Sequence, residues 1–244
     1  MSKIIRIVSE GDALEMLPMP NDVRNTVDFI QVSDRDRIMQ ILHTEAAANE
    51  TYIRSPYNDE CYYRIENYEE SAWQSKISNI ANIARYLGAT KADFKVIQCT
   101  KQTRDTNVNA HVSSIPVSGS FDFTQNEKNS LTNMFNTSLQ FQNTYQPTPE
   151  SYQKAVELAK KHHLYFNNEP MQMMLAMRNP NDIANSLTEW NLHIELCSET
   201  NSDLKVAAKL AAVNWIELDG DFKSATQYVK SVSVDVHFDF MKLS

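Results

Sequence analysis

The chain has 244 residues, of which 42% are hydrophobic and 22% are charged, and both fractions are close to those of ordinary globular proteins. These values exclude global disorder, and the net charge of −8 excludes a general attraction to nucleic acid. The four glycines are isolated, so no glycine-rich phosphate-binding loop is present, and no apolar run has the ~18–20 residues of a transmembrane helix. We therefore expect no nucleic-acid partner, no cofactor and no stable membrane anchor.

The cysteines indicate a reducing compartment. Cys61, Cys99 and Cys197 are far apart, and an odd number without C-x-x-C spacing is typical neither of a disulfide framework nor of a zinc ribbon. The N-terminal segment has too short an apolar run for a secretory signal. We therefore predict a cytoplasmic protein with reduced cysteines. Acidic neighbours of Cys61 and Cys197 disfavour a thiolate, so a cysteine hydrolase is not expected.

The first third of the chain is predicted to contain one strand and two helices. Alternation predicts a strand over Lys3–Val8, and Ser33, followed by acids, predicts the start of a helix that extends to about Tyr52. The clearest helix begins at Asn67, and Gly88 stands where a left-handed residue would end it. Its buried stripe is predicted to be Trp73, Ile77, Ile80, Ala84 and Leu87, with Lys76, Asn79 and Arg85 more exposed.

The middle of the chain is predicted to mix strands with helices. Prolines mark two helix starts, since proline is well tolerated in the first helical turn. The expected strands are Lys91–Thr100, His111–Thr124 and Ser138–Asn143, and the expected helices are Asn126–Phe135, 148–163 and 170–179.

The last third contains the strongest strand signal. Tyr228–Phe240 alternates apolar with polar side chains, as does Trp190–Cys197, and Asp203–Val213 is a predicted helix between them. Clean alternation is typical of an antiparallel sheet with one face in water, and purely apolar strand runs are missing. The sequence therefore predicts an α+β fold: a mainly antiparallel sheet with one face covered by amphipathic helices around a single core.

Two segments of the chain show a weak similarity to each other, which bears on the domain organisation. VSGSFDF at 117–123 resembles VDVHFDF at 234–240, and a helix and a strand precede each. This similarity indicates either a duplication that relates about 67–124 to 170–240, or only the resemblance that all strands with alternating apolar and polar residues share. Because no linker rich in Pro, Gly or Ser separates two halves, we predict one domain over residues 1–244.

The most distinctive group of potential metal-ligating or catalytic residues is Asp235, His237 and Asp239, which a strand places on one face. His193 and Glu195 have the same spacing on another strand, and pairing of the two strands would bring all five together. An imidazole among carboxylates can bind a divalent metal or act as a general base. A solvated sheet face is the simpler interpretation. We therefore keep these residues as metal-site candidates and assign no catalytic residue.

A methionine-rich segment between Pro170 and Pro180 is the candidate for partner binding. Methionine repacks around varied partners, although it also fills ordinary cores. The candidate residues are Met171, Met173, Met174 and Met177.

Three functions stay open at this point. The leading hypothesis is a non-enzymatic interaction or assembly component, because catalytic motifs are missing and Asn, Gln, Ser and Thr are abundant. Its expected partner is another protein or a second copy of itself in a homo-oligomer, and its expected surfaces are sheet edges and the methionine-rich segment. The first alternative is a metal-dependent hydrolase that uses the His, Asp and Glu residues on the strand faces. The second is an oligomerising membrane-active protein with an amphipathic β-hairpin around His111–Thr124.

Overall fold

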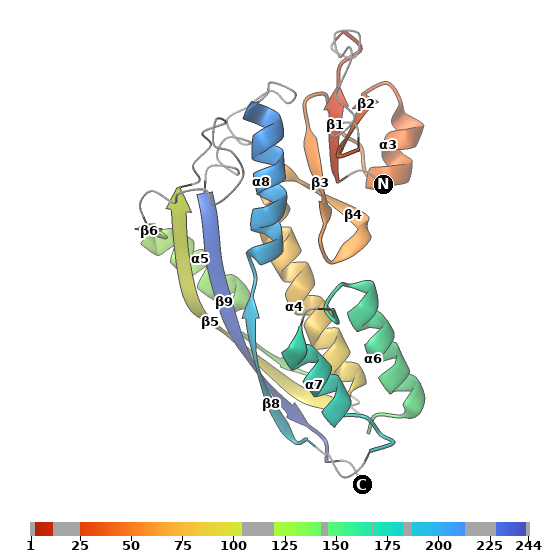
Figure 1. Ribbon diagram of the computed structural model, residues 1–244, viewed down its shortest axis with the longest axis vertical. Coiled ribbons are helices and arrows are strands. Elements are labelled where there is room, and N and C mark those ends of the chain that lie inside the picture. The colour runs from red at the N-terminus through yellow and green to blue at the C-terminus, as the bar shows by residue number, and fades with distance from the viewer. Residues whose placement is uncertain are drawn as a thin grey trace. The chain divides into compact units, whose positions relative to one another are not determined.

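The computed structural model in Figure 1 describes residues 3–11, 25–103, 120–142, 146–166, 168–182, 187–212 and 228–242. The chain divides into two compact units, and each unit combines stretches that are distant in the sequence. Unit 1 comprises Met1–Ala72, Gln102–Ser120 and Glu199–Val229, and unit 2 comprises Trp73–Lys101, Phe121–Ser198 and Lys230–Ser244. The single domain and the internal duplication stay predictions.

Unit 1 is built on a four-stranded sheet in the order β2-β1-β3-β4. β1 pairs in parallel with β2 and antiparallel with β3, and β3 and β4 form an antiparallel pair. All five residues of β1 are buried, so this strand runs through the core of the unit. The elements are β1 (Ile4–Val8), β2 (Val27–Gln31), α3 (Arg35–Leu42), β3 (Thr51–Ser55), β4 (Asn58–Arg64), the 3-10 turn η1 (Ile65–Asn67) and α8 (Ser198–Ala212).

Helices α3 and α8 pack against the two faces of this sheet. Ile5 and Ile7 share a core cluster with α3, whereas Ile4 belongs to a cluster that includes Leu204 and Ala207 of α8. Adjacent residues of a strand point to opposite faces, which explains why neighbouring isoleucines of β1 join different clusters.

A buried polar network ties α8 to the rest of unit 1. The Asp203 carboxylate accepts hydrogen bonds from the Tyr68 hydroxyl and the Lys3 ammonium, and it is almost completely buried. One turn earlier, the Tyr57 hydroxyl donates to Glu199 at 2.8 Å. Burial, with the negative charge of Asp203, raises the pKa of Tyr68, so this tyrosine stays a hydrogen-bond donor at neutral pH.

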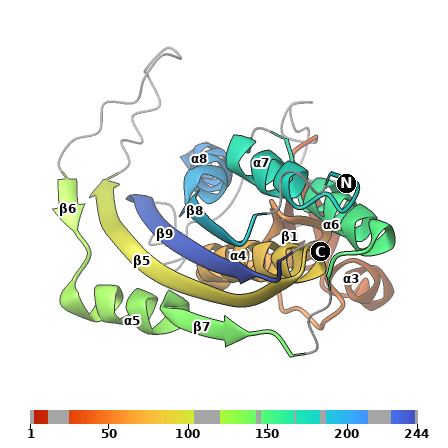
Figure 2. The same cartoon turned by 90° about the horizontal axis from the view of Figure 1, so that it is seen from below.

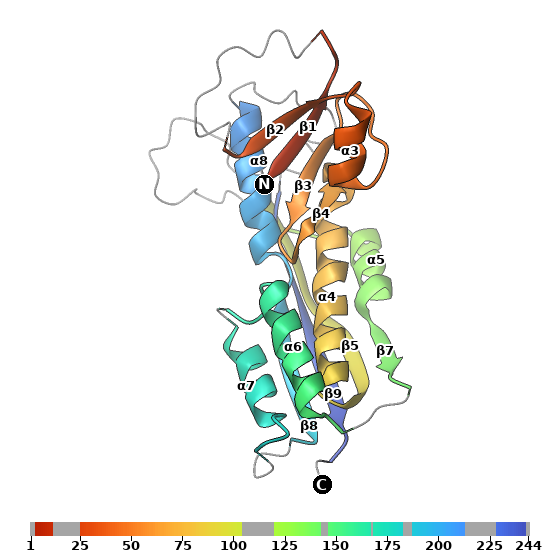
Figure 3. The same cartoon turned by 90° about the vertical axis from the view of Figure 1, so that its right-hand side faces the viewer.

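Unit 2 is built on a curved sheet in the order β6-β5-β9-β8, in which β7 also pairs with β5. The β5–β7 and β8–β9 pairs are antiparallel. Figures 2 and 3 show α4, α6 and α7 together on one side of this sheet. The elements are α4 (Tyr68–Tyr86), β5 (Ala89–Thr103), β6 (Ser120–Asp122), α5 (Gln125–Phe135), β7 (Thr137–Gln140), α6 (Pro149–Lys161), α7 (Glu169–Met177), β8 (Glu189–Glu195) and β9 (Tyr228–Phe240).

The predicted α+β class is confirmed, and so are most elements with a clear local signal. Gly88 adopts a left-handed φ of 83° directly after α4, as predicted. Thr148 caps α6 with Pro149 in its first turn, and β9 has the predicted bounds. The strand predicted at His111–Thr124 lies outside the described residues except for its end, where Ser120–Asp122 forms β6.

Three expectations were wrong. The helix predicted to reach Tyr52 ends at Leu42, because His43 adopts a left-handed φ of 56°, and a hairpin of two strands, β3 and β4, follows. Its cap is Asp34, whose side chain accepts from the Arg37 amide, rather than Ser33. Lys76 is buried instead of exposed, since its ammonium donates to the Glu195 carbonyl at 2.6 Å; the stripe itself is buried as predicted.

Within the described residues, no helix is both long enough and apolar enough to cross a membrane.

Candidate functional site

The polar face of β8 and β9 holds the residues that the sequence singled out. The two strands pair antiparallel, with His193 opposite Asp235, Asn191 opposite His237, and Glu189 opposite Asp239. The pairing that the sequence left open therefore occurs. It places two histidines and several acids on one face, while Leu192 and Ile194 of β8 point into the core.

The polar side chains of this face make short contacts with one another. The His193 Nδ1 lies 2.7 Å from the Asp235 Oδ1, and both side chains are exposed. The His237 Nδ1 lies 2.8 Å from the Asn191 Oδ1, and its Nε2 lies 3.2 Å from the Asp239 Oδ1. Each imidazole thus already has an oxygen partner next to it.

The same face continues onto β5. Lys91 donates a hydrogen bond to Asp93, which also accepts from Ser138 of β7. The bond from Lys91, together with that from Ser138, lowers the pKa of Asp93, and the same bond raises the pKa of Lys91. The electrostatic interaction with His237 also contributes to the lowered pKa of Asp93, so this face of β5 is coupled to that of β9.

The geometry of this surface differs from that of a metal centre. Within the described ranges, no group of three or more His, Cys, Asp or Glu residues is placed to hold a metal ion. Glu195 bonds the Cys197 amide and the Ser231 hydroxyl instead of turning toward His193. Cys197, the last residue of the strand predicted at Trp190–Cys197, is buried, because β8 ends at Glu195 and the chain turns into α8.

The methionine-rich helix α7 is divided between core and surface. Met171 and Met174 are fully buried, Met177 is half-buried, and Met173 is 45% exposed. The four side chains therefore do not line one groove. Met173 is nevertheless an exposed large hydrophobic residue. Another is Phe166, which precedes this helix in the chain and is 61% exposed.

The strand β7 lies at an edge of the described sheet, in the region where the sequence predicted a strand over Ser138–Asn143. It pairs with β5 on one side, and the described sheet ends with it on the other. All four of its residues are exposed, and no other described strand pairs with its outer edge. Figure 2 shows β7 outside β5, at the margin of unit 2.

The register fixes which backbone groups point outward from β7. The Phe141 amide donates to the Thr90 carbonyl at 3.0 Å, so this amide points toward β5. Because backbone amides alternate sides along a strand, Leu139 and Thr137 also point inward, whereas Ser138 and Gln140 direct their N–H and C=O groups to the free edge.

The sequence around β7 lacks the features that usually protect a free edge. Natural edge strands carry charged residues, proline or bulges that discourage pairing with another chain. No Asp, Glu, Lys or Arg occurs between Lys128 and Glu150, although 22% of the whole chain is charged. This uncharged run is the sequence signal that could have identified the edge in advance.

Comparison of the chain with family models, curated proteins and solved structures gave no significant match.

Proposed function

We propose that this protein is a non-enzymatic interaction component that self-associates by strand addition at the β7 edge. One observation carries the proposal: β7 is a free edge strand, exposed on both faces, without a protective charge. Strand addition gives affinity through backbone hydrogen bonds, which any extended partner can supply. The free groups of Ser138 and Gln140 would provide these bonds.

A second copy of the same chain is the partner that the edge fits best. Two antiparallel copies of β7 related by a two-fold axis would pair Ser138 with Gln140 of the partner, because hydrogen-bonded positions must face one another. Leu139 would then lie opposite Leu139 of the partner, at the close non-hydrogen-bonded position. No like charges would meet, since the strand is uncharged. The result is one continuous sheet across the dimer.

The association should be weak. A four-residue strand pair is much smaller than a standard interface of ~1,600 Å², so a dissociation constant of about 1–100 µM is expected. Such a dimer forms and separates as the protein concentration changes, which suits a component of a regulated assembly. Contacts beyond the two paired strands would increase the affinity of the dimer.

Sedimentation velocity over a concentration series tests the proposal. Leu139→Lys would place two ammonium groups opposite one another, and Gln140→Pro would remove an outward N–H without touching the bonds to β5. Both variants should stay monomeric where the wild type dimerises. Met173→Lys is the matched control, because it adds the same charge at another exposed apolar site.

An interface at the β7 edge and an interface at the methionine-rich helix α7 would give opposite results in this experiment. If Met173→Lys prevents dimerisation and Leu139→Lys does not, the methionine-rich helix is the interface and the β7 proposal is wrong. A wild type that stays monomeric to ~1 mM would also refute it.

We further propose a cytoplasmic location for this protein. The support is that Cys61, Cys99 and Cys197 are all free thiols, and Cys197 is buried in the core. Free thiols persist in the reducing cytosol, whereas secreted proteins commonly pair them.

A further inference from the structure

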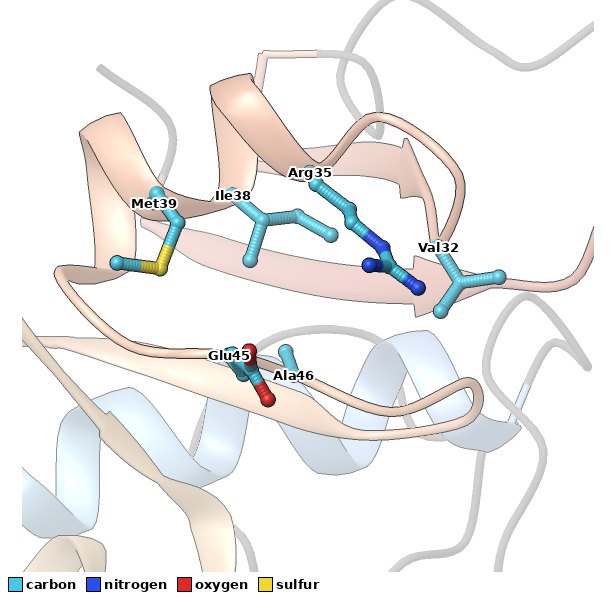
Figure 4. A pocket seen from close by; sticks show the side chains of 6 residues that line it. All are labelled: Val32, Arg35, Ile38, Met39, Glu45 and Ala46. Carbon is cyan, nitrogen blue, oxygen red and sulfur yellow. The ribbon is translucent and has the colours of Figure 1, made fainter.

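A small pocket in unit 1 lies between α3 and the segment that follows it. Its volume is about 210 Å³, and it is lined by Val32, Arg35, Ile38, Met39, Glu45 and Ala46. Figure 4 shows Arg35, Ile38 and Met39 on the α3 side and Glu45 and Ala46 on the facing segment.

The apolar wall of the pocket has a firm part and an adaptable part. Ile38 is buried and belongs to the core cluster of the sheet, so its position is fixed by packing against strands. Met39 is 48% exposed at the rim, and its flexible thioether can adjust to a bound apolar group. Val32 and Ala46 complete this wall as half-buried side chains.

Two opposite charges at the pocket have no ion-pair partner among the described residues. Arg35 and Glu45 both line the cavity, yet neither pairs with the other or with a described neighbour. Three other described arginines of this unit are paired: Arg37 with Asp28, Arg54 with Asp59, and Arg64 with Glu50. With respect to the part of the chain that the structure describes, the pocket therefore offers one unpaired cation and one unpaired anion beside an apolar wall.

We propose that this pocket binds a free α-amino acid with an aliphatic or thioether side chain. The Arg35 guanidinium matches the carboxylate of such a ligand in a forked geometry, and the Glu45 carboxylate matches its ammonium group. The side chain of the ligand would lie against Ile38 and Met39. A volume of about 210 Å³ is below the ~300–1,000 Å³ of pockets for larger ligands, so nucleotides are too large.

Isothermal titration of the full chain with L-leucine and L-methionine tests this site. N-acetyl-L-leucine lacks the ammonium and L-leucinamide lacks the carboxylate, so each should bind at least tenfold more weakly than leucine. Arg35→Gln and Glu45→Gln should each weaken leucine binding about tenfold. Arg37→Gln is the matched control, because Arg37 lies on the same helix but pairs with Asp28 outside the pocket.

The three charged residues are exposed, so thermal unfolding of the variants should match the wild type and confirm that they are folded. Saturable binding that both pocket variants lose and the control keeps supports the site. No saturable binding of either amino acid, or binding that Arg35→Gln and Glu45→Gln leave unchanged, overturns it. Binding of a leucine-ended tetrapeptide in preference to the free amino acid also overturns it, in favour of a peptide end.

Discussion

Arg178 is the residue whose replacement should disturb unit 2 most. Its side chain is fully buried directly after α7, and its guanidinium donates to three backbone carbonyls. The Nε bonds the Leu87 carbonyl at 3.0 Å, and the Nη1 bonds those of Leu187 at 2.7 Å and Met241 at 3.0 Å. The guanidinium also lies 4.8 Å from the centre of the Phe240 ring. One side chain thus joins the end of α4 to the chain segments that flank β8 and β9.

Two opposing contributions set the expected effect of removing it. Each hydrogen bond from a charged donor contributes ~1.5–3 kcal/mol, and a desolvated cation–π contact contributes about 2 kcal/mol. Against this, burial lowers the pKa of the Arg178 guanidinium from 12.5 to about 10, which corresponds to a cost of ~3 kcal/mol for keeping the charge inside. The difference between these contributions predicts that Arg178→Met lowers the free energy of unfolding by about 3–8 kcal/mol.

Urea denaturation at pH 7, followed by tryptophan fluorescence and circular dichroism, measures this loss. Arg178→Lys should lie between the wild type and Arg178→Met, because one ammonium cannot replace a forked guanidinium. Arg85→Met, at an exposed position of α4, is the control and should change stability by less than ~0.5 kcal/mol. A loss of less than ~1 kcal/mol for Arg178→Met would refute the role of Arg178 as a tie between these segments.

Ile80→Ala should cost ~2–5 kcal/mol in urea denaturation because Ile80 is fully buried, whereas the exposed Ser78→Ala should be nearly neutral. Burial would raise the pKa of Glu127, but hydrogen bonds from Lys101 and the helix cap outweigh it and lower this pKa. A lowered folded-state pKa stabilises only the ionised form, so Glu127→Gln should cost at most ~1 kcal/mol at pH 7, and its difference from the wild type should shrink as the pH falls below 4.5, the ordinary pKa of a glutamate. Alkylation of the unreduced protein should modify all three cysteines, with Cys197 reacting only on unfolding; a fixed disulfide would contradict the free thiols.

The sequence predicts those elements whose signals are local. Thr148 and Pro149 mark a helix start, and Gly88 marks a helix end, because capping and left-handed geometry depend on a few adjacent residues. The strand Tyr228–Phe240 is equally clear from alternation alone. The hairpin of β3 and β4 was missed because apolar residues near position 46 continue the helical spacing of α3. The turn at His43 carries no glycine to indicate it.

The candidate sites depend on features that no local pattern contains. Alternation places His193 and Asp235 on polar faces, but their direct pairing follows from the register of two strands that are distant in the sequence. The exposure of β7 follows from the order of strands in the sheet. Likewise, Lys76 is buried because the Glu195 carbonyl accepts a hydrogen bond from its ammonium group, and a helix pattern cannot predict that contact.

Oxidative cross-linking of a Leu139→Cys variant tests the proposed self-association most directly. A two-fold pairing of β7 strands places residue 139 opposite itself, at a Cα separation of ~4.5 Å that a disulfide can bridge. We expect mild oxidation to give a covalent dimer of Leu139→Cys, whereas Met173→Cys and the wild type, with its own cysteines, stay monomeric on non-reducing gels. If Leu139→Cys gives no more covalent dimer than these two controls, the β7 edge does not pair with itself and the proposed function is wrong.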